Sequence, residues 1–365
     1  MGETMLKTVG QQNPVNRRGL GCRTAALSDA TAAYPQSNWH WTGYSFTAMN
    51  TTVQTWLYSQ TDSSVLLDVQ RLFNSFEKRL SRFDANSELA RLNASEQEVF
   101  RASPTLLDAV EIALLAAQAT GGLYDPTILN DLEQAGYDRS FEKIDQAAPI
   151  WQIPAVSPNG PVKPAKPGSL AFRAVYVNRA RREIYKPHGL RLDLGGMGKG
   201  WTVVRAADRL QGLGPYLINA GGDIFGYNSP PGQKGWQIDV VHPLKPEQFM
   251  VRVYLHHRAL ATSTIAKRRW QRNGQIFHHL IDPRTGQPSQ TDAVSVSVVA
   301  DRTVMAEIYA KVALILGAEH GISYLADLPG VEGLFYTAQG EILYTAGFEA
   351  ILCRVEPAGY SSSGR

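Results

Sequence analysis

Hydrophobic residues recur along the 365-residue chain with two spacings. Apolar positions three and four residues apart predict helices at residues 62–80, 104–120, 201–210 and 303–316. Alternating, β-branched or aromatic runs predict strands at residues 45–58, 215–225, 237–242, 249–256 and 294–299. Shorter strands are expected within 171–193 and near 333–337 and 341–345, and a short helix follows the polar loop at 81–93. Helices and strands therefore follow one another along most of the chain.

This pattern is interrupted at both ends and once in the middle. Residues 1–42 are polar and predict a flexible N-terminal extension, and residues 353–365 predict a C-terminal tail. Five prolines in residues 151–169 exclude the interior of a helix or sheet, so this stretch is interpreted as an inserted loop. We expect one domain at residues 43–352.

Composition narrows the possible partners. With 36 basic and 33 acidic residues the formal charge is +3, which is too balanced for a nucleic-acid groove. The tightest basic cluster, residues 267–269, is interpreted as a solvated loop. We therefore expect no nucleic-acid partner.

Cysteines and apolar runs bear on the compartment. Cys22 and Cys353 lie far apart and form neither a disulfide framework nor a zinc motif, which is typical of a reducing compartment. No run of about 18 apolar residues predicts a membrane span. No apolar segment follows Arg17-Arg18 as it would in a secretory signal. We expect a cytoplasmic protein without a transmembrane segment.

The stretch 191–202 is the first candidate for chemistry. It joins a strand-like segment to a helix and contains Asp193, four glycines and Lys199. Glycines at a helix N-terminus let backbone N–H groups approach an anion, and a lysine favours its charge. The spacing matches neither the dinucleotide fingerprint nor the P-loop, so a plain packing joint remains the alternative to a nucleotide site.

Other segments could converge on the same ligand. A second glycine turn ends in Asp223, and residues 262–264 group three hydroxyls. His278 and His279 would point to opposite faces of a strand, so at most one of them faces a site. Glu307 and Lys311 lie four residues apart and are neighbours on one helix face.

Taken together, these segments resemble the ApbE family of FAD:protein FMN transferases. The resemblance rests on their order and spacing over residues 45–350. The matching blocks are residues 48–51, 81–84, 87–89, 92–93, 122–127, 193–200, 219–223, 279–286 and 306–307.

The resemblance implies an α+β fold of the T-fold-like kind with a flavin cleft between two lobes. It implies that FAD is cleaved at its pyrophosphate, that AMP leaves, and that FMN is joined to a Ser or Thr hydroxyl. The partner would be an acceptor flavoprotein with a Ser/Thr flavinylation motif, such as a reductase. Such a phosphoryl transfer needs charge neutralisation, in-line positioning and a base.

The resemblance also assigns roles to single residues. Asp193 and Lys199 would contact FAD, and the Gly196 carbonyl would be a metal ligand. His279 would be the general base, and Asp282 would belong to the catalytic set. We add Lys311 to this set as a candidate of this chain's own, since the family has a different residue there. The residues expected to line the flavin or hold the nucleotide are Met49, Phe83, Leu123, Tyr124, Asp125, Asp223, Thr262, Ser263 and Ile281.

The chain departs from the family pattern at the metal-binding helix. Glu307 and Lys311 stand where the family has Asp and Thr, and Thr264 and Asn50 replace glycines. A lysine amine cannot provide an oxygen ligand for Mg²⁺, so magnesium binding is left open. Our hypothesis is that the Lys311 ammonium, held by Glu307, occupies part of the magnesium space. The alternative is an FAD-binding protein, or an FAD pyrophosphatase, without transferase activity.

Overall fold

The computed structural model describes residues 7–9, 38–144, 170–272 and 275–353. The predicted proline-rich insert and most of the predicted extension and tail lie outside these residues. Within the predicted extension, β1 (Lys7–Val9) pairs with β2, and β2 itself begins at His40, before the predicted boundary at residue 43. These parts of the extension therefore belong to the sheet.

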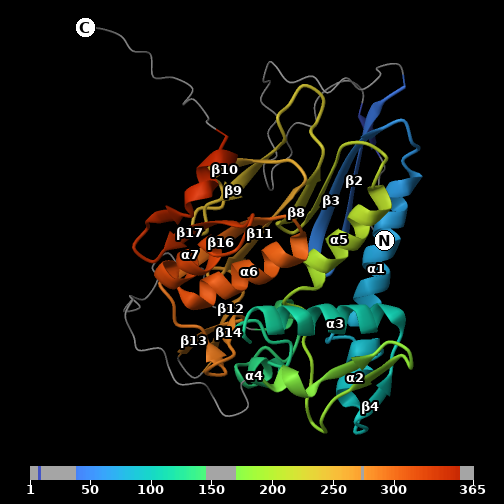
Figure 1. The fold of residues 1–365 in the computed structure, drawn as a ribbon, viewed down its shortest axis with the longest axis vertical. Coiled ribbons are helices and arrows are strands. Elements are labelled where there is room, and N and C mark those ends of the chain that lie inside the picture. The colour runs from blue at the N-terminus through green and yellow to red at the C-terminus, as the bar shows by residue number, and fades with distance from the viewer. Residues whose placement is uncertain (1–6, 10–37, 145–169, 273–274, 354–365) are drawn as a thin grey trace.

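A nine-stranded antiparallel sheet forms the centre of the molecule, in the order β1-β2-β3-β7-β8-β11-β16-β17-β18 (Figure 1). Each strand pairs antiparallel with its neighbours. After β1, the strands are β2 His40–Ala48, β3 Thr51–Ser59, β7 Tyr216–Ala220, β8 Asp223–Tyr227, β11 Arg258–Thr264, β16 Ala293–Ala300, β17 Glu332–Thr337 and β18 Ile342–Tyr344.

Helices cover one face of this sheet. One apolar cluster packs α1 (Ser64–Leu80) and α5 (Gly198–Leu210) on β2, β3 and β7. A second packs α6 (Thr303–Leu316) and α7 (Ala318–Ala326) on β11, β16 and β17. The opposite face is covered by the ribbon of β9 (Trp236–Val241) and β10 (Phe249–Leu255).

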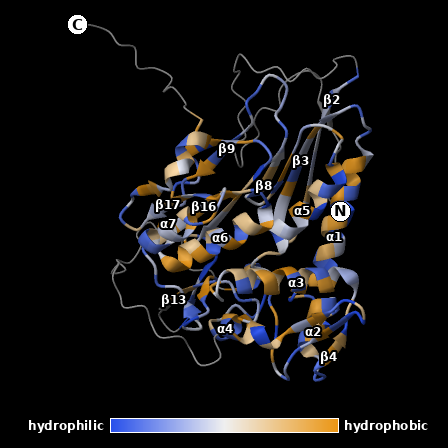
Figure 2. Ribbon diagram, in the orientation of Figure 1, coloured by the Kyte–Doolittle hydropathy of each residue, from blue (hydrophilic) through white to orange (hydrophobic). Residues whose placement is uncertain are grey.

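A smaller lobe lies beyond the ends of α5 and α6 (Figure 1). Its helix α3 (Pro104–Ala119) is largely apolar, as the orange ribbon of Figure 2 shows, and packs against both of those helices in one cluster. The rest of the lobe consists of α2 Glu88–Ala94, α4 Leu129–Gln134, β4 Val99–Arg101, β5 Tyr176–Asn178 and β6 Glu183–Tyr185, and the short 3₁₀ turns Phe141–Lys143 and Ala171–Ala174.

Four short strands lie between β11 and β16: β12 Arg269–Arg272, β13 Gln275–His278, β14 Ile281–Asp282 and β15 Gln287–Pro288. A 3₁₀ segment, Ala346–Ile351, follows β18.

The mixture of helices and antiparallel sheets confirms the α+β class, with some errors of detail. The predicted strand at 45–58 is wrong, because the chain turns at Met49 and Asn50, whose φ angles are 52° and 55°, and forms the hairpin of β2 and β3. No strand leads directly into α5, because β6 ends at Tyr185 and an extended loop follows. Among the described residues, none of the helices is long and apolar enough to cross a membrane.

Candidate functional site

A cavity of about 640 Å³ opens where the sheet and its helices meet the smaller lobe. Its walls come from the turn after α1, the loops before α4 and α5, the β7–β8 turn, β11 and α6. Segments far apart in sequence therefore share one site. The predicted residues that line it are Met49, Phe83, Leu123, Tyr124, Asp125, Asp193, Gly196, Lys199, Asp223, Thr262, Ser263, His279, Ile281, Glu307 and Lys311.

Asp282 is the one predicted site residue that does not reach the cavity wall. Its carboxylate accepts hydrogen bonds from the backbone N–H of Arg284 and from the Arg284 guanidinium, both at 2.9 Å. Asp282 ends β14, and the chain turns back to β15 just after it. Asp282 therefore holds the turn next to Ile281.

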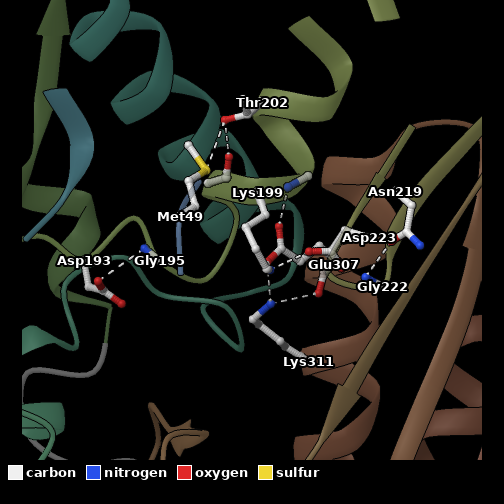
Figure 3. A network of polar contacts seen from close by, with 12 residues as sticks. Met49, Asp193, Gly195, Lys199, Thr202, Asn219, Gly222, Asp223, Glu307 and Lys311 are labelled. Atoms are coloured by element: carbon white, nitrogen blue, oxygen red, sulfur yellow. Dashed lines mark hydrogen bonds and ion pairs between the residues drawn. The ribbon is translucent and has the colours of Figure 1, made fainter. Parts of the chain in front are cut away.

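Two lysines and two carboxylates form a cluster in the cavity (Figure 3). The Lys199 ammonium donates to Asp223 Oδ2 at 2.5 Å and to Glu307 Oε1 at 2.8 Å. The Lys311 ammonium donates to the same Glu307 oxygen at 3.2 Å. The second Glu307 oxygen accepts from the Gly200 backbone N–H at 2.8 Å. Both carboxylates are buried. Each ammonium therefore has an anionic partner, and little water surrounds that partner.

Burial and charge set the protonation of this cluster. Burial raises the pKa of Asp223 to about 6, and the nearby Glu307 carboxylate adds to this rise against the two lysines. Burial alone would raise the pKa of Glu307, but Lys199 and Lys311 outweigh it and hold that pKa below its usual range. Burial lowers the pKa of Lys311, although the Glu307 carboxylate opposes this. The Lys199–Glu307 pair is therefore the firmly charged part of the cluster.

The N-terminus of α5 does bind an anion, but this anion is Glu307. Gly200 is the third residue of the helix, so its N–H lacks an intrahelical partner until a carboxylate of α6 accepts from it. A Cβ on Gly200 would lie 2.7 Å from the Thr303 carbonyl oxygen. The glycine thus lets α5 and α6 approach closely enough for this contact.

The same residues do not fit a magnesium site. Both oxygens of Glu307 already accept hydrogen bonds, and two ammonium groups lie within 3.2 Å of the carboxylate. A Cβ on Gly196 would lie 3.8 Å from Cε of Lys311, so the lysine side chain fills the space beside the glycine loop. In the described ranges no group of three His, Cys, Asp or Glu residues could hold a metal. The partners of the Glu307 carboxylate are therefore two ammonium groups and a backbone N–H.

Asp193 is engaged by the protein rather than free in the cavity. Its carboxylate accepts from the Gly195 N–H at 3.2 Å and lies 3.3 Å from Nε of Arg82. Its backbone N–H donates to the Pro126 carbonyl at 2.7 Å, which joins the glycine loop to the loop before α4. Arg82 lines the cavity and was missed by sequence reasoning, because it lies in a polar segment that predicts a loop.

Only one of the two adjacent histidines faces the cavity, as predicted, although β13 ends at His278 and His279 lies in the bend after it. His278 is buried, and its ring lies 3.1 Å from the Ser289 carbonyl oxygen, away from the cavity. His279 lines the cavity, and its buried Nδ1 has no hydrogen-bond partner within the described part of the chain. Burial, reinforced by the Arg268 charge, holds the pKa of His279 well below its usual range. The ring is therefore neutral at pH 7.

Two other predicted polar groups are held by short-range contacts. Asp125 is buried and accepts from the backbone N–H and the hydroxyl of Thr127 at 2.7 and 2.6 Å. Thr262 lies 2.7 Å from the Ser297 hydroxyl of the next strand. Tyr124 is buried against the glycine loop, since a Cβ on Gly196 would lie 3.1 Å from its ring.

The basic cluster at residues 267–269 was interpreted as a solvated loop, and this holds for part of it, since Lys267 is exposed in the loop after β11. Lys267 and Arg268 line the cavity, and Arg269 is buried in β12. This loop follows β11, whose last residues are the hydroxyl run 262–264. The hydroxyl run and the basic residues therefore lie side by side at the cavity. Three consecutive basic residues gave no sign of this position.

The chain was compared with known proteins. A model of the ApbE family matches residues 49–335. The chain is 28% identical over 309 residues to an FAD:protein FMN transferase of Treponema pallidum, covering 78% of this chain and 80% of the relative. It is 25% identical over 269 residues to one of Vibrio cholerae, covering 72% of this chain and 76% of the relative.

Solved structures agree on the fold. The crystal structure of the ApbE protein from Thermotoga maritima superposes with a TM-score of 0.73 at 21% identity, over 86% of this chain and 99% of the other. The flavin transferase ApbE from Vibrio cholerae gives a TM-score of 0.68 at 23% identity, over 86% and 100%.

Proposed function

The chain belongs to the ApbE family, and from this we propose that it is an FAD:protein FMN transferase. The enzyme would cleave the pyrophosphate of FAD and attach FMN through a phosphoester bond to a Ser or Thr of an acceptor protein. AMP would be the second product. The acceptor would be a flavoprotein with a Ser/Thr flavinylation motif, and a reductase fits this description.

The observation that carries the proposal is the position of two lysines and a neutral histidine in one cavity. Lys199 and Lys311 provide positive charge for a pyrophosphate, and His279 lines the same cavity. Positive groups that are already in place stabilise the charge that develops in a phosphoryl transfer without reorganising solvent.

The roles of the residues follow from this arrangement. His279 would take the proton of the acceptor hydroxyl as its oxygen forms a bond to the phosphorus of the FMN half. The bond between that phosphorus and the bridging oxygen breaks, and AMP leaves with the electron pair. Lys199 and Lys311 would bind the phosphate oxygens during this exchange, and Tyr124 would contact the flavin ring.

We also propose that Lys311 replaces the metal ion. Its ammonium is a point charge next to Glu307, where magnesium would otherwise need oxygen ligands. The wild-type protein should then retain activity in EDTA. The variant Lys311→Thr provides an oxygen at this position and should become dependent on added magnesium. Lys267→Thr, which removes a lysine at the cavity wall, is the matched control and should not.

One experiment separates transfer from binding alone. The protein is incubated with FAD and a candidate acceptor, with and without magnesium, and the acceptor is examined for a mass increase of one FMN and the solution for AMP. The transferase predicts both products, and the variant His279→Ala should abolish the mass increase while FAD still binds. AMP without a modified acceptor would indicate a pyrophosphatase, and bound FAD without AMP would indicate a flavin-binding protein.

A further inference from the structure

Arg82 contacts two neighbouring aromatic rings at the cavity wall. Its Cζ lies 4.1 Å from the centre of the Phe83 ring and 4.6 Å from the centre of the Tyr137 ring. Nη1 donates to the Tyr137 carbonyl at 2.9 Å, and Nε lies 3.3 Å from Oδ1 of Asp193. Only 7% of the side chain is exposed. The guanidinium is thus fixed in position by an ion pair, a hydrogen bond and two rings.

One edge of this guanidinium is unused. Nη2 is buried and has no hydrogen-bond partner among the residues that the structure describes. A buried donor without an acceptor is unfavourable, and the effect is larger for a charged group. A ligand that brings an acceptor to Nη2 therefore gains more than it would from an exposed arginine.

The surroundings of Arg82 favour a flat aromatic ligand. Phe83 is 39% exposed although it lines the cavity, and the apolar side chains of Ile128 and Leu132 line the same space. Asp193, the ion-pair partner of Arg82, lies apart from the lysine and carboxylate cluster in Figure 3. The cavity thus has an aromatic part around Arg82 and a charged part around Lys199 and Lys311.

We propose that Arg82 is a specificity-determining residue that donates a hydrogen bond from Nη2 to the pyrimidine edge of the isoalloxazine ring. This edge bears two carbonyl oxygens, whereas adenine has none, so the contact selects the flavin half of the substrate. The exposed Phe83 ring, which stacks on the guanidinium, moves aside or stacks on the flavin when the contact forms. The inference rests on the proposed function, because it takes FAD as the ligand.

The test measures the two halves of the substrate separately. FMN and ADP are each titrated into the wild-type protein and into Arg82→Met, with calorimetry as the readout. Loss of a hydrogen bond to a charged group should weaken FMN binding roughly 10- to 100-fold. The affinity for ADP should change less than about twofold, because a substitution far from a bound ligand has only a small effect on its binding free energy.

Two further variants separate recognition from a structural effect. Arg82→Lys keeps the charge without the planar donor edge and should recover part of the FMN affinity. Arg79→Met removes an arginine from the same end of α1 that is ion-paired with Glu88 at 3.7 Å and does not line the cavity, so both affinities should stay unchanged. The reduction potential of bound FMN should fall in Arg82→Met, because a guanidinium next to this ring edge stabilises the anionic reduced flavin.

The outcomes are distinct. A loss of FMN affinity with ADP unchanged supports the inference. An equal loss for both ligands would show that Arg82 only holds Asp193 and the loop, and a loss for ADP alone would place the adenine there; either result overturns it. If the wild-type protein bound ADP but no FMN, the proposed function itself would fail, and the inference with it.

Discussion

At Glu307 a single buried carboxylate faces two ammonium groups and a helix N-terminus. Each of these three donors lies inside the protein or at the cavity wall. None of them could replace its contact with Glu307 by a contact with bulk water unless it moved. The side chain therefore acts as a structural anion as well as a part of the candidate site.

The first prediction concerns the removal of this charge. Glu307→Gln keeps the shape but leaves Lys199 and Lys311 facing each other without a shared anion, and breaking a buried pair typically costs about 3–5 kcal/mol. The free energy of unfolding, measured by urea denaturation, should fall by this order. Glu319→Gln, at an exposed position of α7, should change it by less than about 0.5 kcal/mol. Equal stability of the two variants would contradict the structural role.

The second prediction concerns pH. Burial lowers the pKa of His278 to about 4, below its ordinary value near 6.5. Between these two values the unfolded chain binds a proton that the folded chain does not, so stability rises with pH there and is lost as pH falls. At about 1.4 kcal/mol per unit, the loss below pH 4 is of the order of 3 kcal/mol.

His278→Gln should reduce this acid sensitivity, because the amide has no proton to gain in that range. Urea midpoints at several pH values between 4 and 7 measure the slope for both proteins. The exposed His320→Gln is the control and should keep the wild-type slope. A slope that is the same in all three proteins would rule out His278 as its source.

At the scale of elements, the close contact of α5 and α6 positions the site. It depends on Gly200, whose Cβ would collide with the first turn of α6, while a Cβ on Gly198 would meet no atom within 4 Å. Gly200→Ala should therefore destabilise the protein by about 1–3 kcal/mol, as overpacking does, and should weaken FAD binding because Glu307 and Lys199 separate. Gly198→Ala should leave the melting temperature unchanged or raise it. Similar melting temperatures for the two variants would refute the packing argument.

Much of the element order could be predicted from the sequence, because apolar residues recur clearly both at helical spacing and in alternation. The helices α1, α3, α5 and α6 bury regular apolar faces, and β16 alternates between valine and serine from Val294 to Val298. The hairpin of β2 and β3 was missed because its turn uses Met49 in the left-handed region, which side chains other than Gly, Asn and Asp rarely adopt. α7 was missed because a single residue, Gly317, separates it from α6, and its nine residues carry only a short apolar pattern.

The candidate site could be predicted where residues matched a known motif and not where only tertiary structure brings them in. Lys199, Asp223, Glu307 and His279 came from motifs and share the cavity. Arg82 lies in a matching block, residues 81–84, in which only Phe83 was given a role, and Arg268 lies in a segment without a distinctive pattern; the packing of the smaller lobe and the loop after β11 place both at the cavity. The polarity of a loop does not indicate which way its side chains point.

At the scale of the whole molecule, the cavity joins the sheet to the smaller lobe. A ligand that contacts both Phe83 and Lys199 binds the folded chain only, so it stabilises by mass action. FAD at about 100 times its dissociation constant should add about 2.7 kcal/mol and raise the melting temperature by several degrees. The same test with AMP at the same multiple of its own constant should add the same free energy, and a smaller gain for either ligand would show that it also binds the unfolded chain.

Proton binding should be coupled to FAD binding, because the site contains two lysines and two carboxylates, namely Lys199, Lys311, Asp223 and Glu307. The cluster is close to neutral before FAD arrives, and a pyrophosphate brings two more negative charges to it. Asp223, whose pKa is already raised to about 6 by burial, is the group that such a dianion would push further towards its protonated form. FAD should therefore bind with uptake of part of a proton at pH 7, and its affinity should rise as pH falls. The binding enthalpy would then differ between buffers in proportion to their ionisation enthalpies.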